Sequence, residues 1–331
     1  MKYKLIFMAT AMLLTIAFSG CTKERKINTP GNLVPKTVDQ DPSLPSITIN
    51  GAKLHAEAFG SPDSPLLIIV HGGPGSDYRY LLNCKAFANE GYRVVFFDQR
   101  GAGLSQRFPA SAYNSVDVAI NDLKAVIAHY RTSPDQKVFI LGHSWGAMLA
   151  SAFVNSNPTA VQGLILGEPG GLIWKDVLDY LSRSNKFSFF SEDLNDAIYF
   201  EQFLSAKEDE HEILDYKKQL WSSAEDGSSI GNEGPVPFWR SGSVTLSAYF
   251  ETAEREKPDW TTNLHKFTTK VLFIYSQNNK AYGLEHAKKV SSAYPDVQLF
   301  QTNDAGHDML TFPRGWNNTY PVMLDYLNTL R

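Results

Sequence analysis

A series of short, unbroken apolar runs constrains the fold of this chain more than any other feature. Runs of this kind, without polar alternation, are typical of strands buried on both faces. Between two of them lies a helical stretch with Ser115 as a candidate N-cap and Ile120, Leu123 and Ile127 at helix spacing. The alternation predicts an α/β fold with a mostly parallel, doubly wound sheet. The apolar runs are residues 66–70, 94–97, 138–141, 164–166, 271–275 and 297–300.

The composition is that of a globular protein with one large core. The chain has 331 residues, of which 43% are hydrophobic and 20% charged, and its net charge is −4. No stripe rich in lysine and arginine is visible, so nucleic acid is not an expected partner. The folded part begins with an antiparallel pair, because residues 47–49 and 54–56 flank Asn50-Gly51, a dipeptide suited to a two-residue hairpin turn.

The first residues have the layout of a secretory signal peptide. Residues 1–4, with two lysines, precede apolar residues 5–18, and Ser19-Gly20-Cys21 follow. The apolar run is too short to span a bilayer comfortably as a helix. Small residues directly before a cysteine resemble the lipobox of bacterial lipoproteins, whereas a chance cysteine after an ordinary cleaved signal is the alternative. We expect lipidation of Cys21 and a location in the bacterial cell envelope, with the lipid anchor as the only contact with the membrane.

Two further segments differ from the core in composition. Residues 21–45 are polar, contain several prolines and lack apolar periodicity, which predicts an extended tether. Residues 170–260 are amphipathic and aromatic-rich, which indicates a helical cap inserted after the sixth core strand, over the sheet edge where ligands bind. An extra lobe without a role in substrate binding is the alternative. The predicted division is a signal peptide at 1–20, the tether at 21–45, the core at 46–169 and 261–331, and the cap at 170–260.

Gly142-His143-Ser144-Trp145-Gly146 matches the Gly-x-Ser-x-Gly pattern of a nucleophile elbow. The pentapeptide lies directly between an apolar run and a helix-like segment, which is the context that an elbow requires. Its two glycines let the strand turn sharply into the helix and leave the serine hydroxyl exposed. We therefore expect Ser144 to be a nucleophile.

A glycine-rich loop and a late histidine complete the expected chemistry. His71-Gly72-Gly73-Pro74-Gly75 follows the apolar run 66–70, where a loop supplying half of an oxyanion hole belongs. The backbone N–H groups of Gly73 and Trp145 are the expected donors, each worth about 3 kcal/mol at a developing negative charge. His71 is expected to hold the loop.

His307 follows the last apolar run, where the base belongs in the chain order serine, acid, histidine. A serine hydroxyl is a poor nucleophile until a hydrogen-bonded base takes its proton, and that base must be oriented by a third group. We therefore expect His307 to be the general base.

These motifs, together with the segment Asp98-Gln99-Arg100-Gly101-Ala102-Gly103-Leu104-Ser105, resemble those of the prolyl aminopeptidase (proline iminopeptidase) family of α/β-hydrolases. The resemblance covers residues 47–169 and 264–330 well and the cap poorly. It implies the α/β-hydrolase fold and a monomeric or oligomeric hydrolase without a cofactor. It also implies that the protein removes N-terminal residues, often proline, from short peptides.

The third member of the triad departs from the family. There the acid is an aspartate after the seventh strand, but residues 275–280 contain no carboxylate and Asn279 stands at about that place. An amide cannot stabilise an imidazolium, and such a replacement costs about 10⁴ in rate. Glu168 ends the preceding strand at the same edge of the sheet, so we expect Glu168 to orient His307, with Asn279 as the alternative. Asp304 and Asp308 are disfavoured because they flank the histidine.

The cap lacks the tryptophan and glutamate pattern with which family members hold the substrate's amino group. Acidic candidates are Glu201, Glu208, Glu212 and Glu233. Aromatic residues could line an apolar pocket or simply form core: Trp174, Phe189, Phe190, Tyr199, Phe203, Phe238 and Trp239. No metal or nucleotide-cofactor signature is visible, since His211-Glu212 lacks a second histidine at zincin spacing and Gly101 with Gly103 does not complete a dinucleotide fingerprint.

The sequence thus predicts a serine hydrolase without cofactor or metal, acting on a small molecule or short peptide. An aminopeptidase of the proline iminopeptidase kind is the leading interpretation, and a small-ester carboxylesterase is the second. A non-catalytic surface binding protein on a hydrolase scaffold is a third, motivated by the missing aspartate. Haloalkane dehalogenase and epoxide hydrolase chemistry would need a carboxylate at position 144 and is excluded.

Overall fold

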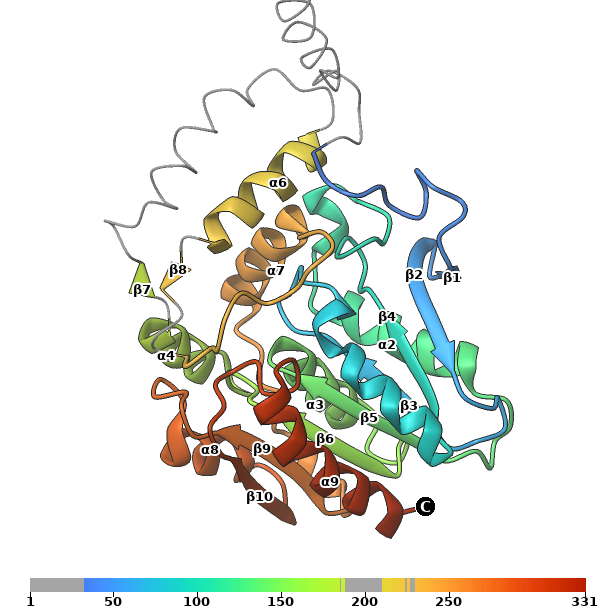
Figure 1. Ribbon diagram of the computed structural model, residues 1–331, viewed down its shortest axis with the longest axis vertical. Helices are drawn as coiled ribbons and strands as arrows, with labels where there is room; N and C mark the ends of the chain where they lie inside the picture. Colours follow the sequence, from blue (N-terminus) through green and yellow to red (C-terminus); the bar gives the residue numbers. More distant parts are fainter. Residues whose placement is uncertain (1–32, 185, 188–209, 224, 227–229) are drawn as a thin grey trace, which may run out of the picture.

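The computed structural model describes residues 33–331 except residues 185, 188–209, 224 and 227–229 (Figure 1). The expected signal peptide, Cys21 and the first part of the tether lie outside the described residues. None of the helices in the described ranges is both long and apolar enough to cross a membrane.

An eight-stranded sheet with the order β1-β2-β4-β3-β5-β6-β9-β10 forms the centre of the molecule. The β1–β2 and β2–β4 pairs are antiparallel and all other neighbours are parallel. This arrangement confirms the mostly parallel sheet of an α/β-hydrolase fold. The strands are β1 (Ser46–Ile49), β2 (Ala52–Phe59), β3 (Leu66–Val70), β4 (Arg93–Phe97), β5 (Val138–His143), β6 (Gly163–Gly167), β9 (Val271–Ser276) and β10 (Val297–Thr302).

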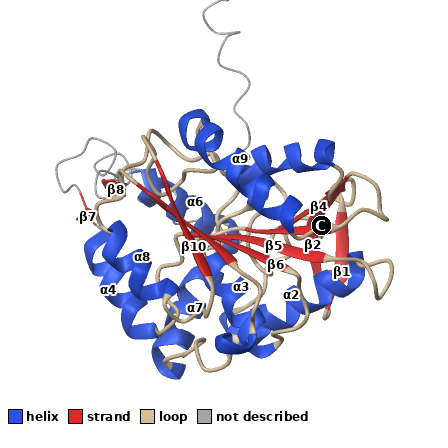
Figure 2. Cartoon of the chain, turned by 90° about the horizontal axis from the view of Figure 1, so that it is seen from below, coloured by secondary structure: helices blue, strands red, loops and turns tan. Residues whose placement is uncertain are grey.

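Helices cover both faces of the sheet (Figure 2). In β3, Leu66, Ile68 and Val70 belong to one core cluster, whereas Leu67 and Ile69 belong to the other, as the two-residue period of a strand requires. Both clusters are apolar, which explains why the strands read as unbroken hydrophobic runs. The first cluster includes α2 (Asp117–Tyr130), α3 (Trp145–Ser156) and α8 (Gly283–Ser291), and the second includes the 3₁₀ helix η1 (Tyr78–Glu90) and α9 (Pro313–Thr329). Two short 3₁₀ helices, η2 (Ala110–Tyr113) and η4 (Leu264–Lys266), complete the core.

Between β6 and β9 the chain forms a group of elements that lies beyond one end of the sheet (Figure 1). Buried charges join it to the core: Asp215 accepts hydrogen bonds from Arg107 Nε (2.9 Å) and Arg240 Nε (2.7 Å). Asp77 accepts from the backbone N–H groups of Trp239 (2.6 Å) and Arg240 (3.1 Å). The Arg107–Asp215 pair and the backbone hydrogen bonds to Asp77 therefore connect the inserted segment to the core. The elements are α4 (Trp174–Ser184), β7 (Lys186–Phe187), α6 (Glu210–Ser223), β8 (Glu225–Asp226) and α7 (Ser243–Glu256).

Residues 33–38, in the middle of the expected tether at 21–45, pack against the body and are not extended away from it. Val34 and Val38 are buried, and Val38 N–H donates to the Leu104 carbonyl (2.8 Å). Leu33 N–H donates to Glu212 Oε1 on α6 (2.7 Å). The prolines of this segment are typical of a tether. They do not reveal that a helix more than 170 residues later in the chain accepts a hydrogen bond from Leu33.

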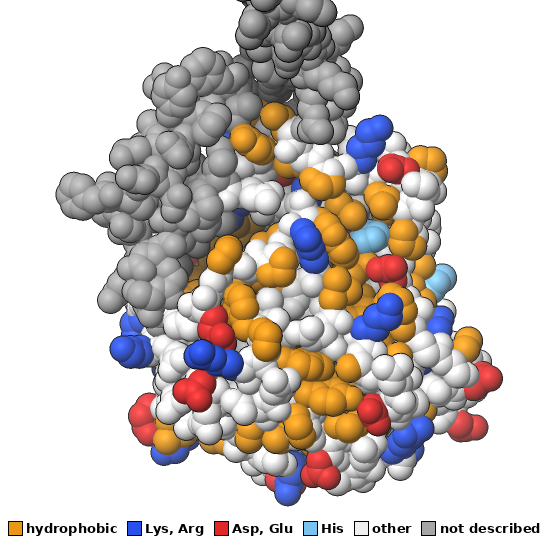
Figure 3. Space-filling view, viewed as in Figure 1, with side chains coloured by type: hydrophobic (Ala, Val, Ile, Leu, Met, Phe, Trp, Pro, Cys, Tyr) orange, Lys and Arg blue, Asp and Glu red, His pale blue; other side chains and the backbone are white. Residues whose placement is uncertain are grey.

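Acidic and basic side chains are interspersed on the face of the molecule in Figure 3. No broad area of this face carries a single sign of charge. The distribution accords with the small net charge of −4.

Candidate active site

Ser144 lies at the junction of β5 and α3 in a strained conformation, with φ 55° and ψ −123°. A non-glycine residue held in this way costs about 1–3 kcal/mol and is typical of functional sites. The turn is possible because glycines allow close backbone crossings. A Cβ atom on Gly142 would lie 2.4 Å from the Gly146 carbonyl oxygen, and one on Gly146 would lie 2.1 Å from that of Val70.

Glu168 follows β6 and is completely buried. Its backbone N–H donates to the Ile274 carbonyl (3.0 Å), so the strand pairing fixes where its side chain begins. One carboxylate oxygen accepts from Ser276 N–H (2.7 Å) and Ser276 Oγ (2.6 Å), and the other from Asn279 Nδ2 (2.7 Å) and His307 Nδ1 (2.7 Å). A buried carboxylate needs such donors to remain charged.

The imidazole of His307 is 13% exposed and directs Nδ1 at Glu168. Burial lowers the pKa of His307, but the hydrogen bond to Glu168 and the negative charge of that residue outweigh burial and leave the pKa raised. With the proton on Nδ1 facing a carboxylate, the neutral ring carries its lone pair on Nε2. A base of this kind can accept a proton at Nε2 and then be stabilised as an imidazolium.

The alternative acids contact other groups. Asn279 is buried and donates to Glu168 and to Tyr180 Oη (3.2 Å), so it supports Glu168 from behind. Asp308 accepts from Asn232 Nδ2 (2.7 Å), and Asp304 is an exposed turn residue. Of the candidates raised by the sequence, Glu168 is therefore the one whose carboxylate contacts His307.

A hydrogen-bonded chain that sequence reasoning missed links three loops of the site. Gly72 N–H donates to Tyr80 Oη (2.7 Å), and the Tyr80 hydroxyl donates to His143 Nδ1 (2.9 Å). His143 Nε2 donates in turn to the His307 carbonyl (2.8 Å). Burial, followed by the neighbouring His307, lowers the pKa of His143 to about 4, so this ring is neutral. A polar residue beside Ser144 within the motif was a signal for His143, whereas nothing in the sequence marked Tyr80.

Gln99 connects the glycine-rich loop to the elbow. Its side-chain amide donates to the His71 carbonyl (2.8 Å) and accepts from Trp145 Nε1 (2.9 Å). Its backbone N–H donates to His71 Nε2 (3.0 Å). His71 is buried, and burial lowers its pKa. Its ring nitrogens contact the Gln99 N–H and the Gly72 carbonyl (2.8 Å), so the ring bridges the loop and the segment after β4, in keeping with the role expected from the sequence.

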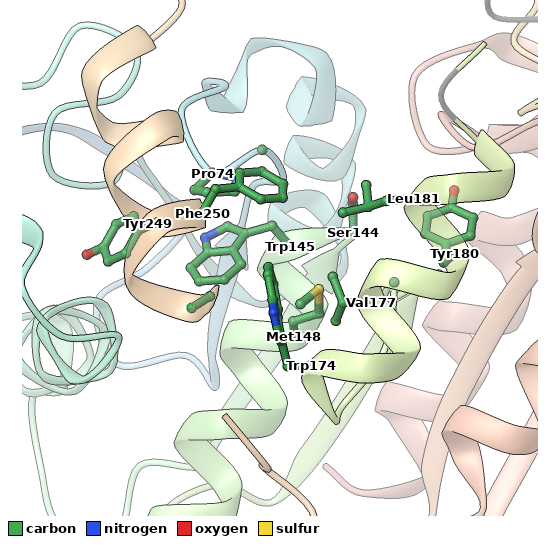
Figure 4. A pocket seen from close by; sticks show the side chains of 13 residues that line it. Pro74, Ser144, Trp145, Met148, Trp174, Val177, Tyr180, Leu181, Tyr249 and Phe250 are labelled. Carbon is green, nitrogen blue, oxygen red and sulfur yellow. The ribbon is translucent and has the colours of Figure 1, made fainter. Parts of the chain in front are cut away.

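A cavity of about 60 Å³ opens beside Ser144 (Figure 4). It brings the expected oxyanion residues, Gly73 and Trp145, to the same space as the nucleophile candidate. The remaining walls come from the oxyanion loop and from α3, α4 and α7. The lining residues are Gly73, Pro74, Ser144, Trp145, Met148, Gly170, Trp174, Val177, Tyr180, Leu181, Tyr249, Phe250 and Ala253.

The aromatic candidates of the inserted segment divide into three groups. Trp174 lines the cavity. Trp239 packs edge-on against His55 and Tyr78, and Phe238 packs against Tyr80, so both belong to the packing between the inserted segment and the core. The other four lie at positions 189–203, outside the described residues. In the ranges that the structure describes, no group of three or more histidine, cysteine or acidic side chains could hold a metal ion.

Comparison with known proteins identifies the family of the chain. The profile of the family described as serine aminopeptidase, S33, matches residues 61–312. The chain belongs to this family. It is 27% identical over 277 residues to proline iminopeptidase PfmaB of Pestalotiopsis fici, covering 80% of this chain and 92% of that protein. A proline iminopeptidase of Arabidopsis thaliana is 39% identical over 113 residues, covering 34% of this chain and 29% of that protein.

A solved structure shows the same fold as this S33 member. The proline iminopeptidase-related protein of Thermus thermophilus superposes with a TM-score of 0.58 at 20% identity, covering 87% of this chain and 97% of that one. Identity at this level supports the α/β-hydrolase fold alone.

Proposed function

We propose that the protein is a serine hydrolase that transfers an acyl group to water through a covalent intermediate on Ser144. The observation that carries the proposal is the 2.7 Å hydrogen bond between His307 Nδ1 and the buried carboxylate of Glu168. It occurs in a fold that also holds Ser144 in a strained elbow conformation. The Glu168 side chain then supplies the charge that Asn279 cannot. This contact argues against a binding protein on a retired scaffold.

Each residue has a definable task in this mechanism. Ser144 Oγ attacks the substrate carbonyl while His307 Nε2 takes its proton, and Glu168 stabilises the imidazolium. The N–H groups of Gly73 and Trp145 bind the oxyanion. His307 then protonates the leaving group, and water repeats the sequence to release the acid and regenerate Ser144.

For the substrate, two classes are supported by different observations. Release of an N-terminal residue from a short peptide is supported by the S33 family and by the proline iminopeptidases among the relatives. Hydrolysis of small esters is supported by the lining of the cavity, in which every described side chain is uncharged. Residues 170–260 are proposed to act as the cap over this site.

We further propose that the protein is a lipoprotein of the bacterial cell envelope, anchored through Cys21. The proposal is supported by the basic, apolar and small-residue pattern of positions 1–21. It places the hydrolase on the far side of a secretory membrane, where cytosolic metabolites are not its substrates.

A fluorophosphonate probe tests the serine mechanism without knowledge of the substrate. The wild-type protein should be labelled covalently, and Ser144→Ala should not. Ser151→Ala is a matched control, because Ser151 is a buried serine of the same helix whose Oγ donates to the Ala147 carbonyl. Labelling that persists in Ser144→Ala would refute the assignment.

A further inference from the structure

The cavity beside Ser144 presents apolar surface even where polar side chains line it. Trp145 Nε1 is engaged by Gln99 Oε1 (2.9 Å), and Trp174 Nε1 by Glu254 Oε2 (2.7 Å). Both indoles therefore have their polar edges paired with residues that do not line the cavity. What remains for a ligand is the surface of aromatic rings and of aliphatic residues such as Val177.

No described lining residue offers a counter-charge for an ammonium group. Of the acidic candidates in the inserted segment, Glu201 and Glu208 lie outside the described residues. Glu212 accepts from Leu33 N–H, and Glu233 is exposed. Glu254 is exposed as well and is bound to the Trp174 edge. A cation transferred from water into such a site is strongly disfavoured unless it is paired.

The cavity is also small. Its volume is about 60 Å³, whereas an apolar cavity that binds benzene has about 150 Å³ and drug-sized ligands occupy about 300–1,000 Å³. The described part of the cavity is therefore suited to a small group, and the rest of a larger substrate would lie outside it.

From these observations we propose that the cavity takes a short, uncharged, apolar acyl group, and that esters of such acids are the substrates. The inference rests on the proposed serine mechanism and narrows its substrate class. The acyl chain packs between Trp145, Trp174 and Val177, and the leaving group points away from the cavity. An aminoacyl group with a free ammonium meets no counter-charge among the described lining residues and is therefore disfavoured.

Isosteric substrate pairs test the inference directly. Isobutyryl and alanyl p-nitrophenyl esters differ by a methyl group in place of an ammonium, and cyclopentanecarbonyl and prolyl esters differ in the same way within a ring. The rate measured with Ser144→Ala is subtracted as background. We expect kcat/KM of the uncharged ester of each pair to exceed that of the aminoacyl ester by about a hundredfold or more, because the ammonium group would be buried without a counter-charge. A preference for alanyl or prolyl esters would overturn the proposal.

Fluorophosphonate labelling separates this failure from that of the mechanism. A protein that is labelled at Ser144 but hydrolyses none of the four esters also refutes the substrate class while leaving the nucleophile intact. A protein that is not labelled overturns both.

Variants locate the acyl group. Val177→Asp adds a carboxylate inside the cavity, and Val177→Asn has nearly the same shape without charge. The ratio of alanyl to isobutyryl activity should be at least about tenfold higher in the aspartate variant, and equal ratios would contradict the placement of the acyl group.

Glu254→Gln should leave the ratio of alanyl to isobutyryl activity unchanged. A selective loss of alanyl activity would show that Glu254 binds the amine and would overturn the proposal.

Discussion

Replacing Glu168 by glutamine changes the protonation pattern of the site while keeping its shape. The wild-type carboxylate accepts two hydrogen bonds from Ser276, one from Asn279 and one from His307. A glutamine that turns its oxygen to Ser276 places its NH₂ group against the Asn279 amide and His307 Nδ1. His307 can meet that NH₂ group only by accepting at Nδ1, which moves its proton to Nε2 and removes the lone pair that Ser144 needs.

The magnitude follows from this tautomer change. Loss of the negative partner with the geometry intact lowers kcat by about 10⁴, equivalent to about 5.5 kcal/mol in the barrier. The stability cost is smaller, about 1–3 kcal/mol for the donor left opposite another donor. Glu168→Gln should therefore remain folded and be nearly inactive.

Steady-state kinetics on the best ester of the panel measures the effect, with thermal unfolding as the check on folding. Asn279→Ala is the comparison, because it removes one of the four donors to the carboxylate without changing the charge, and we expect at most about a tenfold loss. A folded Glu168→Gln protein that retains more than a tenth of wild-type kcat would refute the role of Glu168.

The pH profile gives a second readout of the same variant. His307 must be neutral to act as a base, so kcat/KM should rise with pH through a pKa above the ordinary value of 6.5. In Glu168→Gln the hydrogen bond to a carboxylate and the charge of Glu168, which both raise this pKa, are lost. Burial, which lowers it, and the smaller contribution of Asp308, which raises it, remain. The acid limb of the residual activity should therefore move to lower pH, and an unchanged limb would contradict the coupling.

Three further expectations follow from the described contacts and the N-terminal pattern. His143→Gln keeps a donor near the Nε2 position for the His307 carbonyl, whereas the shorter side chain of His143→Asn reaches only Tyr80. We therefore expect kcat to fall up to about a hundredfold in the asparagine variant and little in the glutamine variant. The folded state lowers the pKa of His143 to about 4, so its contribution to the free energy of unfolding is present above pH 6.5 and is lost as pH falls toward 4. This contribution is on the order of 3 kcal/mol. The urea midpoints of wild type and His143→Gln should therefore converge over that pH range. Cys21→Ala should abolish fatty-acid labelling and membrane partitioning of the full chain. An unlabelled, soluble wild-type protein would contradict the lipoprotein proposal.

Much of the fold could be read from local patterns. Every apolar run that predicted a strand lies within one, and Asn50-Gly51 forms the turn between β1 and β2, with φ of 47° and 76°. Strand and turn preferences act over a few residues, so they leave a readable trace in the chain. The elbow around Ser144 is of the same local kind, because two glycines and one serine within five positions define it.

Contacts between distant segments were decided by the tertiary structure. The sequence left Glu168 and Asn279 both open for orienting His307, and the pairing of β6 with β9 determines that Glu168 reaches the ring while Asn279 stands behind it. The packing of residues 33–38 on α6 has the same origin. Neither partner could be found from composition or spacing.

The surroundings of Ser144 show most clearly which features follow from the sequence and which depend on the tertiary structure. The sequence predicted Ser144 in an elbow and His307 after the last apolar run, but the link from Gly72 through Tyr80 and His143 joins residues up to 235 positions apart. The apolar cavity likewise takes its walls from three helices that are separated along the chain. Periodicity reports which face of an element is buried, whereas the identity of the group it meets depends on how all the elements pack together.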